Sequence, residues 1–436
     1  MAYVVATSRS PLSHDLLGGS EKVRKNVGGV AVALEKAMRS FGGVWVCWGD
    51  GSMDYKYPEE NLDGYSLVRI FLTQKERHGF YDDYSNGTLW PLFHYFRDRI
   101  RHTRSGFRHY YEVNRKFAEK IAEVSGHDSR IWVHDYQLSM VPKLLREEGY
   151  RGKIVFTWHI PWVAREFFSI LPESGHLLES LNSCDLITFH TEDYVRNFRD
   201  SVTGILREKV IPRTKSIPLG IDVNYYSRRT HDEIVERPFE NQKMIFSVDR
   251  LDYTKGLLNR VYAIEELLRK HPDLRRRFVY VMVVNPSRTT VAEYAEMKRE
   301  LEMVIGRVNG QHSDLRWRPI IYIYRKISDA SLMRYYRQAD VALITPLIDG
   351  LNLVAKEFVA ASDHGVLVLS SFAGAARELD GALTVNPNDI EDVAEALLQA
   401  IRMPVEEIKS RLQQLKMTVK RHNLAWWIRA VDRSIR

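Results

Sequence analysis

The sequence predicts an α/β protein built from two doubly wound domains, each with a mainly parallel sheet. Short apolar runs rich in β-branched residues alternate with helical patterns along the chain, as in βαβ units. The alternation restarts after a polar stretch at 227–238, and a length of 436 residues suits two domains. We therefore expect an N-terminal domain over 1–228, a C-terminal domain over 229–418 and a final helical segment over 419–436.

The bulk composition, with 44% hydrophobic and 27% charged residues, is that of an ordinary globular protein. The two cysteines, Cys47 and Cys184, form neither a disulfide framework nor a metal-ligand pattern, which fits a reducing compartment such as the cytoplasm. The start of the chain lacks a signal-peptide pattern, and no apolar run is long enough to span a membrane. We therefore expect no membrane partner.

The net charge of +7 permits nucleic-acid binding but does not indicate it. Basic residues are interleaved with acidic ones, as in Glu293–Glu302, which favours a solvated mixed surface over a nucleic-acid interface. The densest basic stretch, Arg97–Arg108, is expected at a helix end and loop, where it would attract phosphorylated substrates. Assembly into a homo-oligomer is compatible with the sequence.

The first domain begins with a strand at Tyr3–Thr7, and a flexible stretch then leads to Gly28-Gly29 and a helix over Val30–Met38. A glycine pair that opens a helix lets backbone N–H groups approach an anion. Arg9 would add a fixed cation at the carboxyl end of the strand, with a surface ion pair as an equally good interpretation. Further strands and helices are expected at Val44–Trp48, Leu67–Leu72, Glu112–Val124, Ile131–His134, Leu138–Glu147, Ile154–Trp158 and Leu186–Phe189.

Three strands of this domain are followed by a polar residue, namely Asp135, His159 and His190. Because the carboxyl ends of parallel strands share one edge of a sheet, three such residues favour a cleft there. The segment Tyr81–Trp90 has no clear period and is interpreted as a loop leading into a helix, with aromatic rings that would stack on a sugar. A satellite hydrophobic cluster is the alternative, above all for Trp90.

The second domain restarts with a strand at Met244–Val248 and a loop that carries Arg250 and Lys255. Two like charges so close favour a bound anion such as a diphosphate. Neutralisation by Asp249 and Asp252 is the alternative. Further strands and helices are expected at Leu257–Lys270, Phe278–Val284, about Thr290–Ile305, Ile320–Tyr324, Val341–Thr345, Val366–Ser370, Leu383–Val385 and Leu415–Arg436.

The loop Leu347–Asn352 joins a buried strand to a helix over Leu353–Ala361 and is expected at the carboxyl edge of the sheet. Glu357 would hold a ribose diol, and Asp349 would hold hydroxyls of the group attached to the anion. This pattern suits a sugar nucleotide, while a capped βα loop without a ligand is the plain alternative. Backbone N–H groups at the helix start would point at the anion, and they belong to Asn352, Leu353 and Val354.

Together these motifs resemble the trehalose-6-phosphate synthases, which are retaining glycosyltransferases of family 20 with the GT-B fold, two Rossmann-like domains facing a central cleft. The resemblance runs over nearly the whole chain in one order. It implies glucose transfer from a nucleotide-glucose, UDP-glucose or a related donor, to glucose-6-phosphate, giving trehalose-6-phosphate, with no cofactor and no metal. The motifs that carry it are Arg9 with Gly28-Gly29, Tyr81 with Leu89–Pro91, Val133–Tyr136, His159–Pro161, Arg250–Gly256 and Asp349–Glu357.

The resemblance implies roles for the matching residues. The donor diphosphate, ribose and base would be bound by Gly28, Gly29, Arg250, Lys255, Ile327 (through its backbone), Asn352, Leu353, Val354 and Glu357. The acceptor site would comprise Arg9, Tyr81, Trp90, Asp135 and Arg288. The catalytic set would be Arg250, Lys255, Asp135, His159 and Asp349, of which His159 and Asp349 hold hydroxyls of the transferred glucose. The acceptor hydroxyl would give its proton to the departing phosphate, so no general base is named. The final helix would cross back to the first domain.

The sequence departs from the family in three places, one of which is the N-terminal loop from Pro11 to Val27, whose sequence is too divergent to align in detail. Trp162-Val163-Ala164 follows His159-Ile-Pro161 where the family has an aromatic residue, a proline and a small residue, and this would reshape the glucose pocket. Asp249 stands where the family has glutamate. Two other functions stay open: a glucosylglycerol-phosphate synthase, with glycerol 3-phosphate as acceptor, and a non-catalytic sugar-phosphate sensor. The matched acceptor residues favour glucose-6-phosphate, and the retained donor residues argue against the sensor.

Overall fold

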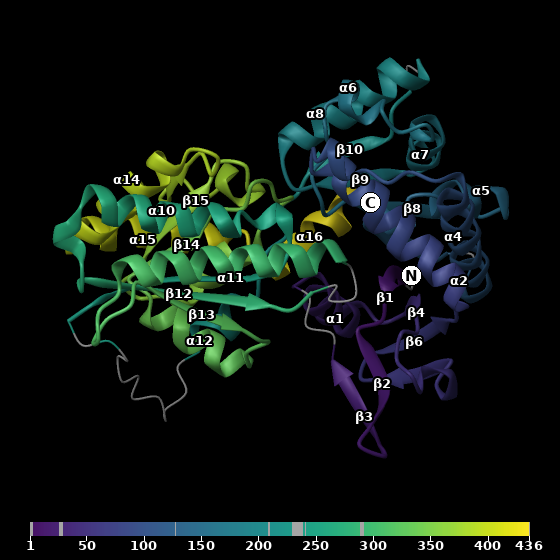
Figure 1. Ribbon diagram of the computed structural model, residues 1–436. Helices are drawn as coiled ribbons and strands as arrows, with labels where there is room; N and C mark the ends of the chain where they lie inside the picture. Colours follow the sequence, from purple (N-terminus) through teal and green to yellow (C-terminus); the bar gives the residue numbers. More distant parts are fainter. Residues whose placement is uncertain are drawn as a thin grey trace. The chain divides into compact units, whose positions relative to one another are not determined.

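The structure of the protein is a computed structural model that describes residues 3–25, 29–126, 128–207, 210–228, 239, 241–287 and 292–435. The chain divides into two compact units (Figure 1). Unit 1 comprises Met1–Pro218 together with Ala425–Arg436, and unit 2 comprises Leu219–Leu424. Each unit has its own largely parallel sheet accompanied by helices, so the predicted α/β fold class is confirmed.

In the described part of unit 1, the sheet has eight strands in the order β10-β9-β8-β7-β1-β4-β6-β5, and only β5 among them runs antiparallel to its neighbour. Interior residues such as Val5, Trp45 and Val133 are fully buried, as expected for apolar strands covered on both faces. The order reverses at β1, so a ligand is expected at the carboxyl ends of β1 and β7. The strands are β1 (Tyr3–Arg9), β4 (Val44–Trp48), β5 (Glu59–Leu62), β6 (Tyr65–Ile70), β7 (Arg130–His134), β8 (Lys153–Thr157), β9 (Leu186–Phe189) and β10 (Arg213–Ser216).

Among the residues of unit 2 that the structure describes, six parallel strands form a sheet in the order β13-β12-β11-β14-β15-β16. Here the order reverses at β11, so the expected ligand edge lies at the carboxyl ends of β11 and β14. The loops that carry the predicted donor residues follow these two strands. The strands are β11 (Lys243–Arg250), β12 (Phe278–Asn285), β13 (Ile320–Tyr324), β14 (Val341–Ile344), β15 (Val366–Ser370) and β16 (Leu383–Val385).

Helices connect the strands in both units, and the two helices predicted beside the donor loops, α10 and α13, have the predicted bounds. No helix within the described ranges has both the length and the hydropathy that crossing a bilayer requires. The helices of unit 1 are α1 (Gly29–Phe41), α2 (Gln74–Arg77), α3 (Trp90–Phe93), α4 (Arg104–Val124), α5 (Val141–Glu147), α6 (Arg165–Phe168), α7 (Ser174–Asn182), α8 (Glu192–Ser201) and, from Ala425 on, α16 (Leu424–Ile435). Those of unit 2 are α9 (Val223–Ser227), α10 (Leu257–Lys270), α11 (Ala292–His312), α12 (Asp329–Gln338), α13 (Leu353–Ala361), α14 (Ile390–Arg402) and α15 (Val405–Arg421).

The boundary between the units differs from the expected one, because unit 1 ends at Pro218 and not at residue 228. The polar stretch after 226 resembles a linker, yet the residues before it already pack with unit 2. The Leu424 backbone N–H donates to the Ile221 carbonyl at 2.9 Å, so the outgoing and returning segments are hydrogen-bonded to each other. Helix α9 packs on α13. No local sequence pattern indicates these contacts. Because of them, the boundary between the units lies at Pro218, ten residues before the predicted one.

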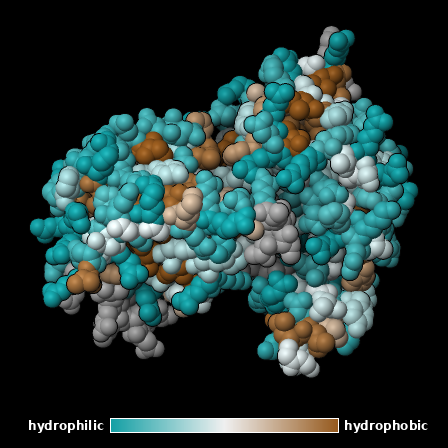
Figure 2. Space-filling view, in the orientation of Figure 1, coloured by the Kyte–Doolittle hydropathy of each residue, from teal (hydrophilic) through white to brown (hydrophobic). Residues whose placement is uncertain are grey.

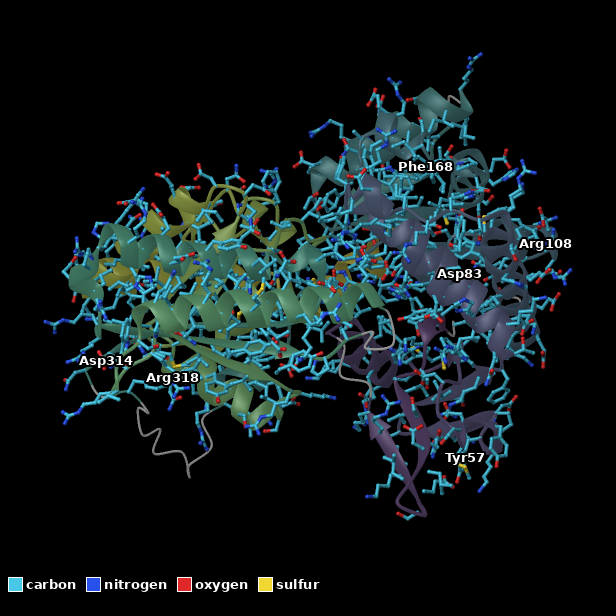
Figure 3. The ribbon with its side chains drawn as sticks, in the orientation of Figure 1. Tyr57, Asp83, Arg108, Phe168, Asp314 and Arg318 are labelled. Atoms are coloured by element: carbon cyan, nitrogen blue, oxygen red, sulfur yellow. The ribbon has the colours of Figure 1, made fainter. Side chains whose placement is uncertain are left out.

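Residues 12–25 form a β-hairpin in place of the expected flexible stretch. Strand β2 (Leu12–Leu17) pairs with β3 (Ser20–Lys25) around Gly18-Gly19, whose φ angles of 61° and 78° suit a tight hairpin turn. Tyr57, labelled in Figure 3, stacks on His14 at the base of the hairpin, with ring centroids 4.1 Å apart. Neither face of the outer hairpin is buried, so no alternating apolar pattern marks it. The hydrophobic tip in Figure 2 includes the exposed side chains of Leu16, Leu17 and Val23.

The segment Tyr81–Trp90, expected as a loop, is helical. It forms most of η2 (His78–Leu89), a π-helix that continues into α3. A π-helix has more residues per turn than an α-helix, so the usual 3.6-residue period is missing from its sequence. Its inner face is fully buried through Phe80, Tyr84 and Leu89.

The tail, expected as one helix over Leu415–Arg436, consists of α15 and α16. Helix α16 packs on unit 1, where the Asp432 carboxylate accepts hydrogen bonds from the Tyr3 hydroxyl at 2.6 Å and from Arg130 Nη1 at 2.8 Å. The Trp427 side chain is fully buried. The end of the chain is thus part of the core that surrounds β1 and β7.

Candidate active site

In unit 2, Arg250 is the last residue of β11 and Lys255 lies on the loop after it, and each of these predicted cations has a carboxylate partner. Arg250 Nη2 lies 3.0 Å from Asp252 Oδ2, as one of the two weighed alternatives proposed. Lys255 Nζ lies 2.5 Å from Asp349 Oδ2, which joins the loop after β11 to the loop after β14. The Arg250 side chain is 40% exposed, so a ligand phosphate has access to its guanidinium.

Arg260 holds the loop after β11 in place through its guanidinium. This residue was not identified from the sequence. It is almost fully buried on α10. Its Nη2 donates to the Lys255 carbonyl at 2.9 Å, its Nε donates to Thr345 Oγ1 at 3.2 Å, and its Nη1 lies 2.7 Å from Asp249 Oδ2. Asp249 therefore serves Arg260 and does not neutralise the predicted cations. An arginine on the apolar face of Leu257–Ile264 was the available signal.

The predicted anion site at the start of α13 is preorganised by Asn352. This residue has a positive φ of 78°, and its Oδ1 accepts from the Ala355 N–H at 3.2 Å, so it caps the helix as predicted. Its Nδ2 also donates to Asp349 Oδ2 at 3.2 Å. The N–H groups of Leu353 and Val354 lie in the first turn, where the helix itself offers no acceptor. They are suited to an anion.

The loop after β15 holds the backbone of Asp349 through two hydrogen bonds. The Asp349 N–H donates to the Phe372 carbonyl at 3.1 Å, and the Gly374 N–H donates to the Asp349 carbonyl at 3.0 Å. A Cβ atom at Gly374 would lie 2.1 Å from the Gly350 carbonyl oxygen, so only glycine fits there. This support was also missed, since a single glycine between alanines is a weak signal.

Glu357, on the second turn of α13, is held by two tyrosines. The Tyr336 hydroxyl donates to Glu357 Oε2 at 2.9 Å, and Tyr226 hydrogen-bonds to the same side chain. Burial raises the pKa of Glu357 above its ordinary value, and the two hydrogen bonds oppose this only in part. Ile327, whose backbone was predicted to read the base, is half-buried in the loop between β13 and α12, at the same edge of the sheet.

In unit 1, Arg9 is the last residue of β1, and its guanidinium is paired with Asp50. Arg9 Nε donates to Asp50 Oδ2 at 3.0 Å, and Nη2 is ion-paired with the same oxygen. Burial alone would lower the pKa of Arg9, but interactions with Tyr81 and Asp50 outweigh it and raise this pKa. The structure therefore brings Arg9 and Tyr81 together, as the acceptor prediction requires.

Asn86 connects the other predicted acceptor residues. Its Nδ2 donates to the Tyr81 carbonyl at 2.8 Å, and its Oδ1 accepts from the Tyr136 hydroxyl at 3.1 Å. The centroid of the Tyr136 ring lies 5.9 Å from that of the Trp90 ring. The backbone N–H of Tyr136 donates to Asp135 Oδ1 at 3.0 Å. The Trp90 side chain is only 8% exposed, so most of its surface is buried against other residues, as in the alternative interpretation of a hydrophobic cluster.

Three buried histidines form a row beside Asp135, at the ends of β7, β8 and β9. His134 Nδ1 lies 3.0 Å from His159 Nε2, and His159 Nδ1 lies 3.2 Å from His190 Nε2. Burial lowers the pKa of His134 and His159 well below the ordinary value, so both are neutral at neutral pH. Both ring nitrogens of His159 are engaged. A glucose hydroxyl that binds this ring must therefore replace a histidine contact.

Asp135 holds a strained backbone, with a φ of 70°. Its Oδ1 accepts from the His159 N–H at 3.3 Å, which ties the end of β7 to the segment after β8. A positive φ in a non-glycine residue is uncommon and concentrates at ligand sites. This strain agrees with a role for Asp135 in binding.

Within the segment that departs from the family pattern, where Val163 replaces a proline, the side chain of Trp162 belongs to the protein core. Trp162 is fully buried, its Nε1 donates to Ser201 Oγ at 3.1 Å, and its ring packs among aromatic neighbours with centroids 4.7–5.1 Å away. These neighbours are Phe93, Trp158, Phe168 and Phe198. The expected reshaping of the glucose pocket therefore does not come from the Trp162 side chain, which points into this cluster.

Two predicted site residues, Gly28 and Arg288, lie outside the described residues, while Gly29 begins α1. The basic stretch Arg97–Arg108 runs from a 3₁₀ turn into the start of α4, and Arg108 projects outward (Figure 3). In the part of the chain that the structure describes, no three His, Cys, Asp or Glu side chains are grouped so that they could hold a metal ion.

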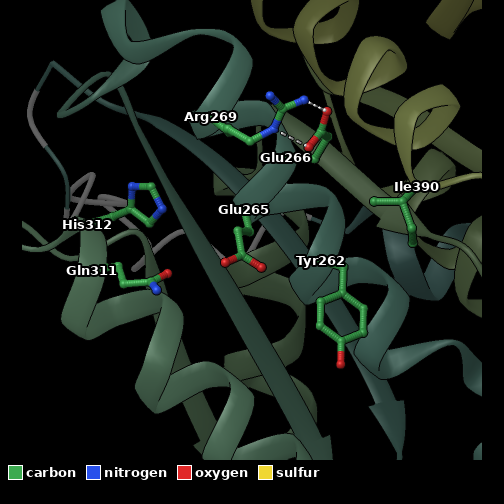
Figure 4. Close-up of a pocket in the computed structure, with 7 residues that line it drawn as sticks. All are labelled: Tyr262, Glu265, Glu266, Arg269, Gln311, His312 and Ile390. Carbon is green, nitrogen blue, oxygen red and sulfur yellow. Dashed lines mark hydrogen bonds and ion pairs between the residues drawn. The ribbon is translucent and has the colours of Figure 1, made fainter.

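A surface pocket of about 440 Å³ lies elsewhere in unit 2 (Figure 4). Its carboxylates are already paired, Glu266 with Arg269 at 2.6 Å and Glu265 with Arg307. It contains none of the predicted site residues. Its lining consists of Tyr262, Glu265, Glu266, Arg269, Gln311, His312 and Ile390.

Two doubly wound units, with an anion-ready helix start on one and a cation beside an aromatic group on the other, define a glycosyltransferase of the GT-B fold. The model of glycosyltransferase family 20 matches residues 4–436, and the chain belongs to this family.

Three similar proteins extend this assignment. A bifunctional trehalose-6-phosphate synthase/phosphatase of Thermoproteus tenax is 38% identical over 98% of this chain, which spans 62% of that protein. A solved E. coli trehalose-6-phosphate synthase bound with UDP-2-fluoro glucose is 33% identical, with a TM-score of 0.92 over 100% of this chain and 99% of that one. A UDP-forming α,α-trehalose-phosphate synthase of Burkholderia xenovorans in complex with glucose-6-phosphate is 32% identical, with a TM-score of 0.91 over 100% of both chains.

Proposed function

We propose that the protein transfers glucose from a nucleotide-glucose to glucose-6-phosphate, with retention at the anomeric carbon, and so forms trehalose-6-phosphate. The observation that carries the proposal is the gathering of Arg250, Lys255 and the N-terminus of α13 at the switch point of the unit 2 sheet. This is a site for a diphosphate. Relatives with UDP-2-fluoro glucose and with glucose-6-phosphate, each matching this chain over its whole length, support the two substrate classes.

In this reaction the sugar–phosphate bond breaks and negative charge builds on the departing diphosphate. Arg250, Lys255 and the first-turn amides of α13 would stabilise that charge, since fixed donors and cations act strongly where charge develops. Lys255 and Asp349 are paired before binding, so the diphosphate would take over Lys255 and release Asp349 to the glucose hydroxyls. The acceptor hydroxyl would pass its proton to the departing phosphate, and no separate base is assigned.

The acceptor would bind in unit 1, with its phosphate on Arg9 and its sugar near Tyr81, Trp90 and Asp135. The network through Asn86 and Tyr136 holds these groups in fixed relation. Cys47 and Cys184 are both free and buried, which supports our proposal that the protein acts in the cytoplasm.

The function is tested by incubating the purified protein with glucose-6-phosphate and UDP-, ADP- or GDP-glucose, followed by mass spectrometry. We expect a disaccharide phosphate with at least one donor. A product formed only when glycerol 3-phosphate replaces glucose-6-phosphate would transfer the proposal to a glucosylglycerol-phosphate synthase. Nucleotide binding without any product would favour the sensor.

Nucleotide affinity is expected to fall on acidification at a pH above the ordinary glutamate pKa of about 4.3. The ionised Glu357 is the form that accepts both ribose hydroxyls, and its raised pKa means that this form is lost at a higher pH. Calorimetric titration of UDP between about pH 5 and pH 8 measures the effect. In E357Q the affinity for UDP should be lower at neutral pH and should no longer fall on acidification. The same fall in E357Q as in the wild type would show that Glu357 is not the group that titrates.

A further inference from the structure

We propose that Asp50 is a positioning residue that holds one edge of Arg9 and thereby aims the other edge at the acceptor phosphate. This inference rests on the proposed function, because it concerns the acceptor site. Asp50 lies just after β4, and β4 is the direct neighbour of β1 in the sheet. No motif in the sequence marks it.

Asp50 binds one edge of the Arg9 guanidinium. Its Oδ2 accepts from Nε at 3.0 Å and is ion-paired with Nη2, while its Oδ1 accepts from Ser13 Oγ at 2.6 Å. Both carboxylate oxygens are therefore used, and the Asp50 side chain is only 7% exposed. A guanidinium has a second edge, formed by its two terminal nitrogens, which matches two phosphate oxygens. The Arg9 side chain is 46% exposed, so a ligand can reach that edge.

The pair also affects which ligands bind. Arg9 is charged, as arginine is throughout the physiological pH range, and its interactions with Tyr81 and Asp50 raise its pKa further despite partial burial. The Asp50 carboxylate offsets much of this charge, so a ligand gains little from charge alone. A phosphate gains more, because it offers two oxygens to an arginine edge that is already oriented. Asp50 would therefore favour phosphorylated acceptors over free sugars.

A purely structural role is the competing explanation, because Ser13 belongs to the hairpin and Asp50 thereby anchors β2. Asp15 provides a matched control. It accepts from the Ser52 N–H at 3.1 Å and pairs with Arg24 at 3.0 Å, so it anchors the same hairpin through Arg24 and not through Arg9. Loosening the hairpin through Asp15 should leave phosphate binding close to that of the wild type.

The test measures binding of glucose-6-phosphate and of inorganic phosphate to the full chain by calorimetry. We expect D50A to weaken both ligands about tenfold, which corresponds to the loss of one charge-assisted contact. D50N keeps the side-chain shape and one acceptor, so its loss should be about threefold. In an R9A background, D50A should add less than about a twofold loss, since neighbouring residues that act through one another are not additive. D15N should bind as the wild type does.

The inference is overturned if D50A binds phosphate as well as or more tightly than the wild type, or if its loss persists in the R9A background. A loss in D15N equal to that in D50A would assign the effect to the hairpin. Inorganic phosphate separates the two proposals. If the wild type binds it but not glucose-6-phosphate, the proposed acceptor is wrong, while the comparison of D50A with R9A still decides the role of Asp50.

Discussion

Replacing Lys255 by alanine is expected to lower kcat by at least about 100-fold, because one fixed positive charge at the leaving group is lost. The same substitution leaves Asp349 without its 2.5 Å partner, and its carboxylate would then repel the diphosphate. The KM for the donor should therefore rise as well. Steady-state kinetics with saturating glucose-6-phosphate measures both values. R250A should lower kcat similarly, with a smaller effect on the Asp349 side chain.

R269A is the matched control for these variants. Arg269 is a paired cation in the same unit, on the outer surface with Glu266 as its partner, and it lies outside the proposed donor site. Its removal should change neither kcat nor KM by more than about twofold. If K255A loses less than about tenfold, or changes only the acceptor KM, Lys255 does not stabilise the leaving group.

The second large effect is on stability, and we expect K356M to destabilise unit 2 by about 3 kcal/mol or more. Lys356 is fully buried on α13, donates to the Leu219 carbonyl at 2.8 Å and is ion-paired with Glu378. Burial lowers the pKa of Lys356, although Glu378 opposes this. Glu378 also accepts from His422 Nδ1 at 3.0 Å, so one cluster of paired side chains joins the donor helix to both chain segments that leave the unit.

Removal of Lys356 would take the ammonium partner from the Glu378 carboxylate, which is 11% exposed, and leave it the hydrogen bond from His422. The midpoint of urea unfolding, followed by fluorescence, measures the loss. The double variant K356M/E378Q should recover part of it, because the unpaired charge is then absent. K409M removes a lysine whose pair with Glu406 is largely exposed, and it should have an effect near zero. A K356M midpoint equal to that of K409M would show that the buried pair does not stabilise the unit.

The parallel strands and the helices α10 and α13 could be predicted because both carry strong local signals. Buried strands read as continuous apolar runs, and α13 has a capping residue at its start. The hairpin over 12–25 and the π-helix η2 lack these signals, since the outer part of the hairpin has no buried face and η2 has no 3.6-residue period. The boundary at Pro218 depends on pairing between residues about two hundred positions apart, which no local pattern records.

The candidate site shows the same division. Arg250, Lys255 and Asp349 could be predicted as a group because a parallel sheet brings the loops after its strands to one edge. Their partners could not. Asp50 and Arg260 act through contacts made only in the folded chain, with Arg9 and with the Lys255 carbonyl. The engagement of both His159 ring nitrogens likewise arises from three neighbouring strands, although each strand end was identified separately.

Formation of an α,α-linked disaccharide phosphate is tested by the linkage of the product. The product formed from a nucleotide-glucose and glucose-6-phosphate is dephosphorylated and treated with an α,α-trehalase, and released glucose is measured. We predict complete conversion to glucose, with no conversion of the product before dephosphorylation. A dephosphorylated disaccharide that resists the trehalase would rule out trehalose-6-phosphate as the product, because the donor glucose would then have been transferred to another hydroxyl or with inversion.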